Sequence, residues 1–219
     1  MFRFAAKVIF SFLSALLALA GPAAAQAPVG LSAAAAPTPA PSFRNAVRFD
    51  VGGVLASNLA NTLLGNGGLL LPLLASYERQ LGQRFGLVGE ALLNGGPAWE
   101  RKAGVAVQGR YYLFPTRDRT ALSGCYLAPV LSYRAVAMGG VYESRVHRPI
   151  GGVGVLAGWQ HALGHSPNLF IDLSFGVMSW KKIGPDKVDG PAQPDYSRQT
   201  YYEFHGTDAD GRLGIGFRF

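Results

Sequence analysis

The histidines of this chain, and the carboxylates near them, are the residues whose chemistry could define a site. His205 lies close in sequence to Glu203, Asp208 and Asp210. Imidazole and carboxylate groups can ligate a metal ion or transfer protons. The segment around them is polar throughout, so we interpret it as a solvated loop and predict neither a metal site nor a catalytic site there.

A second candidate is His165, which is followed by Ser166. The pair has no carboxylate at a recognisable spacing, as a hydrolase triad would require, and we expect a solvated turn. The chain also has no serine-centred elbow, phosphate-binding glycine loop or cysteine pair. Its single cysteine, Cys125, has no metal-ligating neighbour and reads as a small apolar filler. We therefore predict a protein that is not an enzyme and needs no cofactor.

The composition points to strands in contact with lipid. Of the 219 residues, 49% are hydrophobic and only 15% are charged, against roughly 25% charged in a typical soluble domain. The longest apolar run after the N-terminus, GGLLLPLLA, is far shorter than the roughly 20 residues of a membrane-spanning helix. The 29 glycines also favour strands and tight turns over helices.

The N-terminus has the features of an export signal. Arg3 and Lys7 precede the apolar stretch VIFSFLSALLALA, and the small residues AAAQA follow it. We predict a signal peptide over 1–25, a disordered Ala/Pro-rich leader over 26–44, and a folded domain over 45–219. The formal charge of +7 is spread over scattered arginines of an exported chain, so we expect no nucleic-acid partner.

The elements that must position any site are eight segments in which apolar and polar residues alternate. Most are about as long as the 9 to 11 residues that a tilted strand needs to cross a bilayer. The predicted strands are 46–56, 69–78, 84–93, 103–113, 124–136, 150–160, 169–180 and 211–219.

The connectors also alternate in character. The segments after the second, fourth and sixth strands read as turns on the side of both termini, and the others, including the long 181–210, read as loops on the opposite side. An open sheet cannot lie in hydrocarbon, because its edges leave backbone groups unpaired. The pattern therefore predicts an all-β fold, an eight-stranded antiparallel up-and-down transmembrane β-barrel, present as a monomer.

The same alternation gathers charged residues on the inward face. Eight strands enclose a bore that side chains can fill, so we expect a plug of paired charges, which disfavours a narrow solute pore. The predicted lumen charge network consists of Arg48, Asp50, Glu78, Glu90, Arg110, Arg134, Asp172, Arg212 and Arg218.

Aromatic residues fall near the ends of the predicted strands. Trp and Tyr rings prefer the headgroup level of a membrane, so we interpret these residues as interfacial girdles. The alternative is ligand stacking by Tyr196, Tyr201 and Tyr202. The aromatic set is Tyr111, Tyr112, Phe114, Tyr126, Tyr133, Trp159, Trp180, Tyr201 and Tyr202.

Three stretches resemble small outer-membrane β-barrel proteins of Gram-negative bacteria, of the OmpA/OmpX-like kind. They are LLLPLLASYERQLGQRFGLVGEALL, GCYLAPVLSYR and the alternating RLGIGFRF that ends in Phe219. The resemblance implies location in the cell outer membrane, contact with its lipid and lipopolysaccharide, and recognition of Phe219 by the barrel assembly machinery.

Together these patterns predict a non-enzymatic barrel with a structural or cell-surface interaction role. The segment 181–210 is the expected recognition surface for an extracellular ligand, because loops carry function more often than the scaffold below them. Two alternatives stay open: a lipid A-modifying enzyme of the same fold, and a narrow solute pore.

Overall fold

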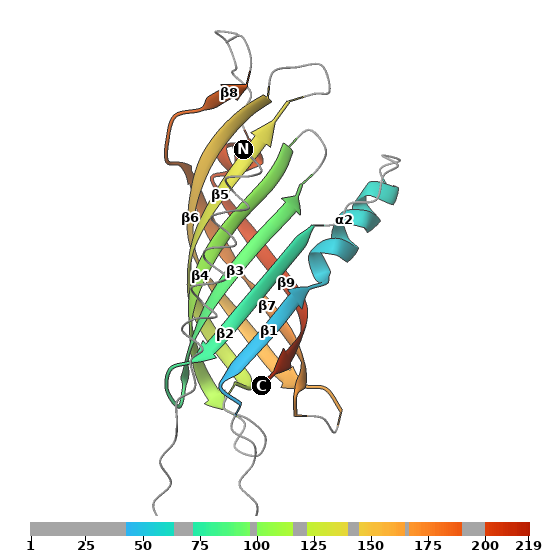
Figure 1. Ribbon diagram of the computed structural model, residues 1–219, viewed down its shortest axis with the longest axis vertical. Coiled ribbons are helices and arrows are strands. Elements are labelled where there is room, and N and C mark those ends of the chain that lie inside the picture. The colour runs from blue at the N-terminus through green and yellow to red at the C-terminus, as the bar shows by residue number, and fades with distance from the viewer. Residues whose placement is uncertain are drawn as a thin grey trace, which may run out of the picture.

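The computed structural model describes residues 43–63, 72–96, 100–115, 122–139, 145–164, 167–189 and 200–219. The predicted signal peptide (1–25) and all but the last two residues of the predicted leader (26–44) lie outside the described residues. Figure 1 shows the described elements as a tall barrel with a helix beside it.

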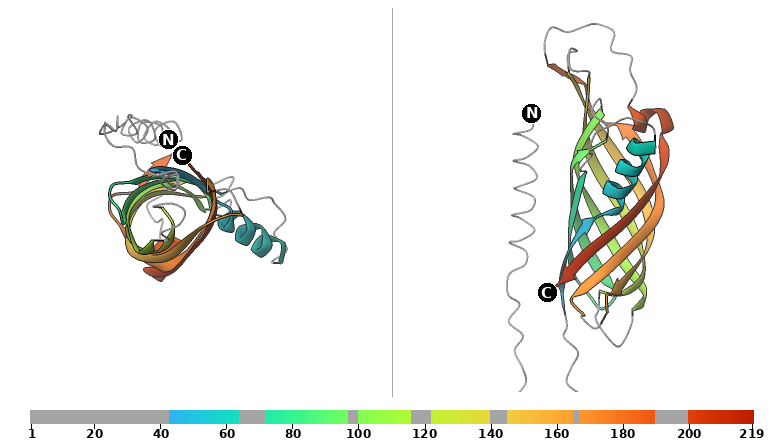
Figure 2. Two further views of the ribbon diagram at one scale, coloured as in Figure 1. Left: turned by 90° about the horizontal axis from the view of Figure 1, so that it is seen from below. Right: turned by 90° about the vertical axis from the view of Figure 1, so that its right-hand side faces the viewer.

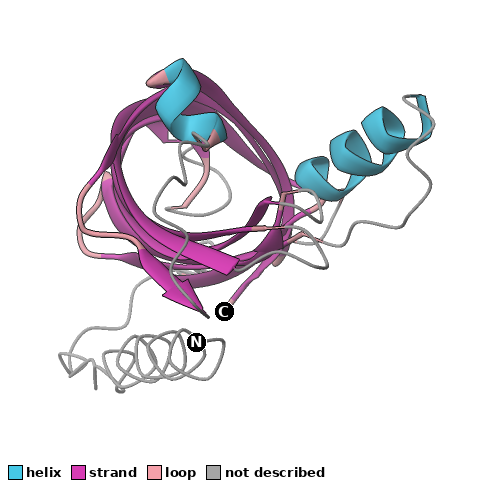
Figure 3. Ribbon diagram, turned by 90° about the horizontal axis from the view of Figure 1, so that it is seen from above, coloured by secondary structure: helices cyan, strands magenta, loops and turns pink. Residues whose placement is uncertain are grey.

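Eight antiparallel strands close into a barrel, which confirms the predicted fold class. Each strand pairs with its neighbour in sequence, and the last strand, β9, pairs with both β7 and β1. Figure 3 shows the closed ring from above. One further strand, β8 (Lys187–Asp189), is additional to these eight and pairs with β6. The barrel strands are β1 (Asn45–Asp50), β2 (Leu73–Gln80), β3 (Phe85–Gly95), β4 (Glu100–Pro115), β5 (Gly124–Met138), β6 (Arg145–Ala162), β7 (Leu169–Lys182) and β9 (Thr207–Arg218).

The two ends of the barrel differ as the sequence predicts. Asn45 and Phe219 meet at the lower end of Figure 1, where their backbones exchange two hydrogen bonds of 3.0 and 2.9 Å. The strands β2, β4 and β6 end at this lower end too. The strands β3, β5 and β7 end at the upper end, where β8 also lies.

The first two strands are shorter than predicted. The strand expected over 46–56 ends at Asp50, and the chain turns into α2 (Gly52–Leu63), while β2 begins only at Leu73. Asp50 Oδ1 accepts a hydrogen bond of 2.7 Å from the Gly53 N–H, which satisfies a free donor at the helix start. The carboxylate that was predicted to face the lumen thus also starts a helix.

The segment 181–210, predicted as a loop, contains regular structure near its C-terminal end. The helix α3 (Tyr201–His205) precedes β9, which already begins at Thr207. Thr200 and Glu203 form a capping box, in which each side chain accepts a hydrogen bond from the other residue's backbone N–H. Among the described residues, no helix has the length and apolar character needed to cross a membrane.

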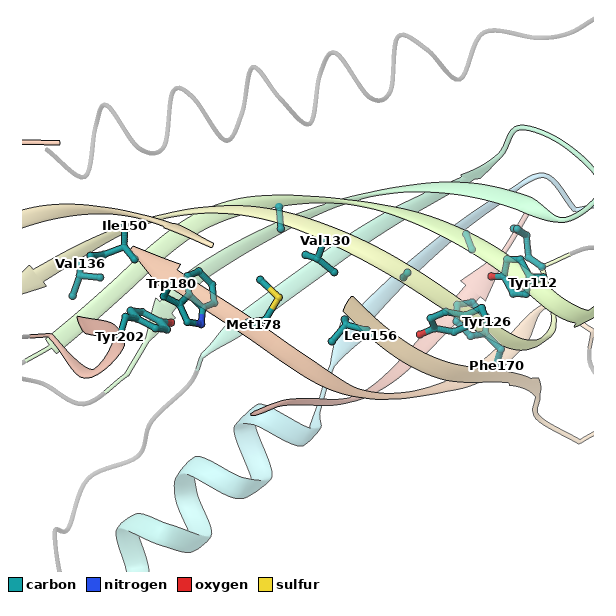
Figure 4. Packing of buried hydrophobic residues seen from close by; sticks show 14 of the residues in the cluster. Tyr112, Tyr126, Val130, Val136, Ile150, Leu156, Phe170, Met178, Trp180 and Tyr202 are labelled. Carbon is teal, nitrogen blue, oxygen red and sulfur yellow. The ribbon is translucent and has the colours of Figure 1, made fainter. Parts of the chain in front are cut away.

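Large rings that point inward are accommodated by glycines on the neighbouring strand. Phe170 pairs with Gly216, Tyr126 with Gly158, and Trp180 with Gly152. A Cβ at any of the three glycines would lie 2.2 to 2.3 Å from the opposing ring. Figure 4 shows Tyr112, Tyr126 and Phe170 as one layer and Trp180 with Tyr202 as another, with smaller apolar residues between them.

Candidate functional site

The lumen of the barrel contains a chain of buried ion pairs. Arg48 lies 3.0 Å from Glu90 Oε1 and 2.7 Å from Asp172 Oδ1, although the second contact lacks hydrogen-bond geometry. Arg110 Nη1 lies 2.8 Å from Asp172 Oδ2 and 2.9 Å from Glu78 Oε2. Each arginine therefore bridges two carboxylates that come from different strands.

Arg212 of β9 extends this series of ion pairs toward the upper end of the barrel. It pairs with Glu90 and, through Nη2 at 2.8 Å, with Asp210 Oδ2. In order, the chain of ion pairs, which we call the lumen network, runs Asp210, Arg212, Glu90, Arg48, Asp172, Arg110 and Glu78. Charges alternate along it, so each buried charge has an opposite neighbour that offsets its desolvation.

Two tyrosines, absent from the predicted network, complete its lower part. The Tyr126 hydroxyl donates to Asp172 Oδ1 at 2.9 Å, and the Tyr112 hydroxyl lies 2.7 Å from Glu78 Oε1 and 2.8 Å from Gln160 Oε1. The Tyr112 hydroxyl contacts the Glu78 oxygen that Arg110 leaves free, and the Tyr126 hydroxyl supplies a hydrogen bond to the Asp172 oxygen that also faces Arg48. The arginines compensate the charges of these acids, and the tyrosine hydroxyls also hold their carboxylates in position.

Three predicted members lie outside the lumen network. Asp50 caps α2. Arg218 is buried, donates to the Pro167 carbonyl at 3.0 Å, and lies 4.6 Å from the centre of the Phe170 ring. Arg134 lies over Trp180 in the upper layer.

The upper layer combines cations with aromatic rings. The Arg134 guanidinium lies 4.4 Å from the centre of the Trp180 ring and also hydrogen-bonds the Tyr202 hydroxyl. Lys102 Nζ lies 4.5 Å from the centre of the same Tyr202 ring. Because Tyr202 belongs to α3 and is almost fully buried, this helix holds a ring inside the mouth of the barrel.

A second group of ion pairs, which we call the rim clasp, joins the upper connections to β6. Arg148 donates to both oxygens of Asp186 at 2.9 and 2.6 Å, and it pairs with Glu203 of α3. Lys182 Nζ adds a contact of 3.0 Å to Asp186. One arginine thus links the segment before β8 to α3.

The rim clasp favours the ionised carboxylates. Hydrogen bonds from Arg148 hold the pKa of Asp186 below its usual value, with partial burial opposing and Lys182 assisting. Partial burial raises the pKa of Glu203, but hydrogen bonds from the Thr200 backbone and from Arg148 outweigh it and lower the pKa overall. Both acids are therefore charged at neutral pH.

The residues that the sequence offered for metal binding are dispersed. Glu203 belongs to the capping box and the rim clasp, and Asp210 pairs with Arg212 in β9, so neither lies in a solvated loop. His205 is exposed, with its ring edge-on to Phe204. In the described ranges no three His, Cys, Asp or Glu side chains group as metal ligands. His165 and Ser166 lie outside the described residues.

The girdle interpretation is wrong for four of the aromatic residues. Tyr112, Tyr126, Trp180 and Tyr202 are buried in the lumen, whereas Tyr111, Tyr133 and Trp159 are exposed on the outer wall. The spacing along the strands could have revealed these inward positions. Tyr112 on β4 and Tyr126 on β5 lie an even number of residues from the inward Arg110 and Arg134, so they share the inward face of their strands. Tyr202 is unavailable for surface stacking, and Tyr196 lies outside the described residues.

The outer wall presents apolar side chains to its surroundings. Every barrel strand contributes at least one exposed large hydrophobic residue to this surface, which we call the apolar belt. Its members include Phe49, Leu73, Phe85, Val107, Leu131, Val155, Phe175 and Ile215. The barrel therefore has a charged interior and an apolar exterior, the reverse of a water-soluble domain.

No protein-family model matches the chain, and comparisons with curated proteins and with solved structures give no match either.

Proposed function

We propose that the protein is a non-enzymatic outer-membrane β-barrel with a structural or surface-interaction role at its upper end. The observation that carries the proposal is the apolar belt, because so large an exposed apolar surface on all sides of a closed barrel matches a lipid environment. Outer-membrane lipid and lipopolysaccharide are the proposed surroundings.

The lumen supports a scaffold rather than a conduit. Its ion pairs join strands that are not neighbours in the sheet, such as β1 with β3 and β4 with β7, and Arg48, Arg110 and Glu90 are all buried. A solute would have to break several of these pairs to pass, leaving buried charges unpaired.

The upper end supplies the proposed interaction surface. It carries β8 and α3, which the rim clasp holds in one arrangement. Such pre-ordering lowers the entropy cost of binding a partner. At the lower end, Phe219 is half exposed beside the Asn45 backbone, where we propose that the barrel assembly machinery recognises it.

The test places a charge on the apolar belt. Leu173→Arg, on the outward face of β7, should destabilise a lipid-embedded barrel by about 2 to 4 kcal/mol. On a water-facing surface the same change stays within about 0.5 kcal/mol. Urea midpoints in phospholipid vesicles measure the difference, with Thr207→Arg at the upper end as the matched control. Equal midpoints for the two variants, or a folded wild-type protein in the soluble fraction of cells, would contradict the proposal.

A further inference from the structure

Among the described residues, the barrel wall has an edge beside α2 that no strand covers. The last pair between β1 and β9 is Asp50 with Gly214, and one more hydrogen bond of 2.8 Å joins the Val51 N–H to the Leu213 carbonyl. Beyond that bond, the described part of the chain supplies no strand that pairs with β9 on this side. We call the interval between β2 and the upper half of β9 the notch.

The notch lies at the height of the apolar belt. The upper half of β9 borders the notch with one edge and pairs with β7 along the other edge. In that pairing, Leu213, Gly211 and Ala209 lie opposite Leu173, Phe175 and Val177. These three β7 side chains point outward and are 54%, 65% and 52% exposed. If the belt contacts lipid, as proposed above, the edge of β9 that no described strand pairs lies at the level of hydrocarbon, where free backbone groups are unfavourable.

The helix beside the notch is suited to the same surroundings. Leu55 and Leu59, one turn apart, are each 63% exposed. No charged residue occurs anywhere from Val51 to Tyr77. Figures 1 and 3 show α2 projecting away from the wall rather than packing along it. The helix begins in close contact with β9, since a Cβ at Gly52 would lie 2.9 Å from Leu213 Cβ.

We infer that the notch is a lipid-binding site in the outer half of the membrane. The acyl chains of the bound lipid lie along Leu55 and Leu59, and its ester, amide or hydroxyl groups hydrogen-bond the backbone of Gly211 and Ala209. This inference rests on the proposed function. A second copy of the chain fits less well, because the projecting helix, seen from above in Figure 3 and from below in the left view of Figure 2, obstructs the flat approach that edge-to-edge strand pairing needs.

Three single-cysteine variants in a Cys125→Ala background test the site. Gly211→Cys places a fluorescent label in the notch, where the new Cβ meets only Phe175 at 3.7 Å. Leu59→Cys labels α2, and Leu131→Cys labels the exposed wall of β5, away from the notch. Each labelled protein is reconstituted in phosphatidylcholine vesicles that contain spin-labelled phosphatidylcholine, and iodide serves as the aqueous quencher.

The inference predicts that lipid spin label quenches all three positions at least twice as strongly as iodide does. Quenching at Leu131→Cys without quenching at Gly211→Cys and Leu59→Cys would overturn the lipid site and leave the proposed function intact. Absence of lipid quenching at all three positions would overturn the proposed function itself. Protection of Gly211→Cys from both quenchers that grows with protein concentration would assign the notch to a second copy and also overturn the inference.

Discussion

At the scale of single residues, the lumen network depends on each charge having an opposite neighbour. Glu90 is the central case, because it accepts from Arg48 on one side and pairs with Arg212 on the other. Both arginines are buried. Loss of this carboxylate charge would remove the shared partner of two guanidinium groups and leave each with a single acid, Asp172 for Arg48 and Asp210 for Arg212.

We therefore expect Glu90→Gln to destabilise the barrel by about 3 to 5 kcal/mol, the usual cost of breaking a buried pair. The control is Lys182→Ala, which removes a partly exposed partner of Asp186 and should cost about 0 to 1 kcal/mol. Urea midpoints in detergent micelles measure both. Equal midpoints would show that Glu90 does not stabilise the folded barrel through its charge.

Asp50 shows how one side chain decides the identity of an element. Its alternation places it among lumen charges, yet its carboxylate accepts the Gly53 N–H and begins α2. Asp50→Ala should weaken the helix start by about 1 kcal/mol, whereas Asp50→Asn should retain it, because both Asp and Asn cap helices. Hydrogen exchange of the α2 amides distinguishes the variants. Equal protection in both would rule out the capping role.

At the scale of elements, the rim clasp connects α3 to β6 and to the segment before β8. Its stability should depend on pH through Asp186 and Glu203. Their pKa values are lowered in the folded protein, so the clasp is fully formed above their unfolded-state pKa values, about 3.9 and 4.3. It is lost as the pH falls through the folded values.

Hydrogen exchange at the Glu203, Phe204 and Gly206 amides should therefore show protection that is constant from pH 7 to about pH 5 and falls below about pH 4. Exchange rates must first be corrected for their intrinsic pH dependence. Arg148→Gln removes the cation and should reduce protection already at pH 7. A loss of protection between pH 7 and 5 in the wild type would mean that other groups control the clasp.

At the scale of the whole molecule, the two ends of the barrel should face different compartments. Lys187 in β8 is exposed at the upper end, and Arg84 is exposed in the turn after β2 at the lower end. Trypsin added to intact cells should cut after Lys187 and leave Arg84 intact until the outer membrane is permeabilised. Mass spectrometry of the peptides reads both sites. The opposite order would invert the proposed topology and move the rim clasp to the periplasmic side.

The architecture of the barrel could be predicted from local sequence patterns. Alternation with period two separates an inward from an outward face, and turn-like segments mark the reversals, so strand number, direction and the side of each connection follow without knowledge of contacts. The same parity selects the inward positions of Arg48, Glu90 and Asp172. It applies equally to Tyr112 and Tyr126, whose aromatic character suggested a girdle instead.

What only the tertiary structure decided is which inward groups meet and where strands stop. Neighbouring strands are staggered, so residues far apart in sequence such as Glu90 and Arg212 become partners only when the barrel closes. Val51 to Ala56 belongs to the first predicted strand, yet the residues beyond Asp50 form α2, because the Asp50 cap and close packing against Leu213 favour a helix. Period-two patterning reports the face that each residue occupies, whereas partner choice and strand length depend on register and packing across the closed sheet.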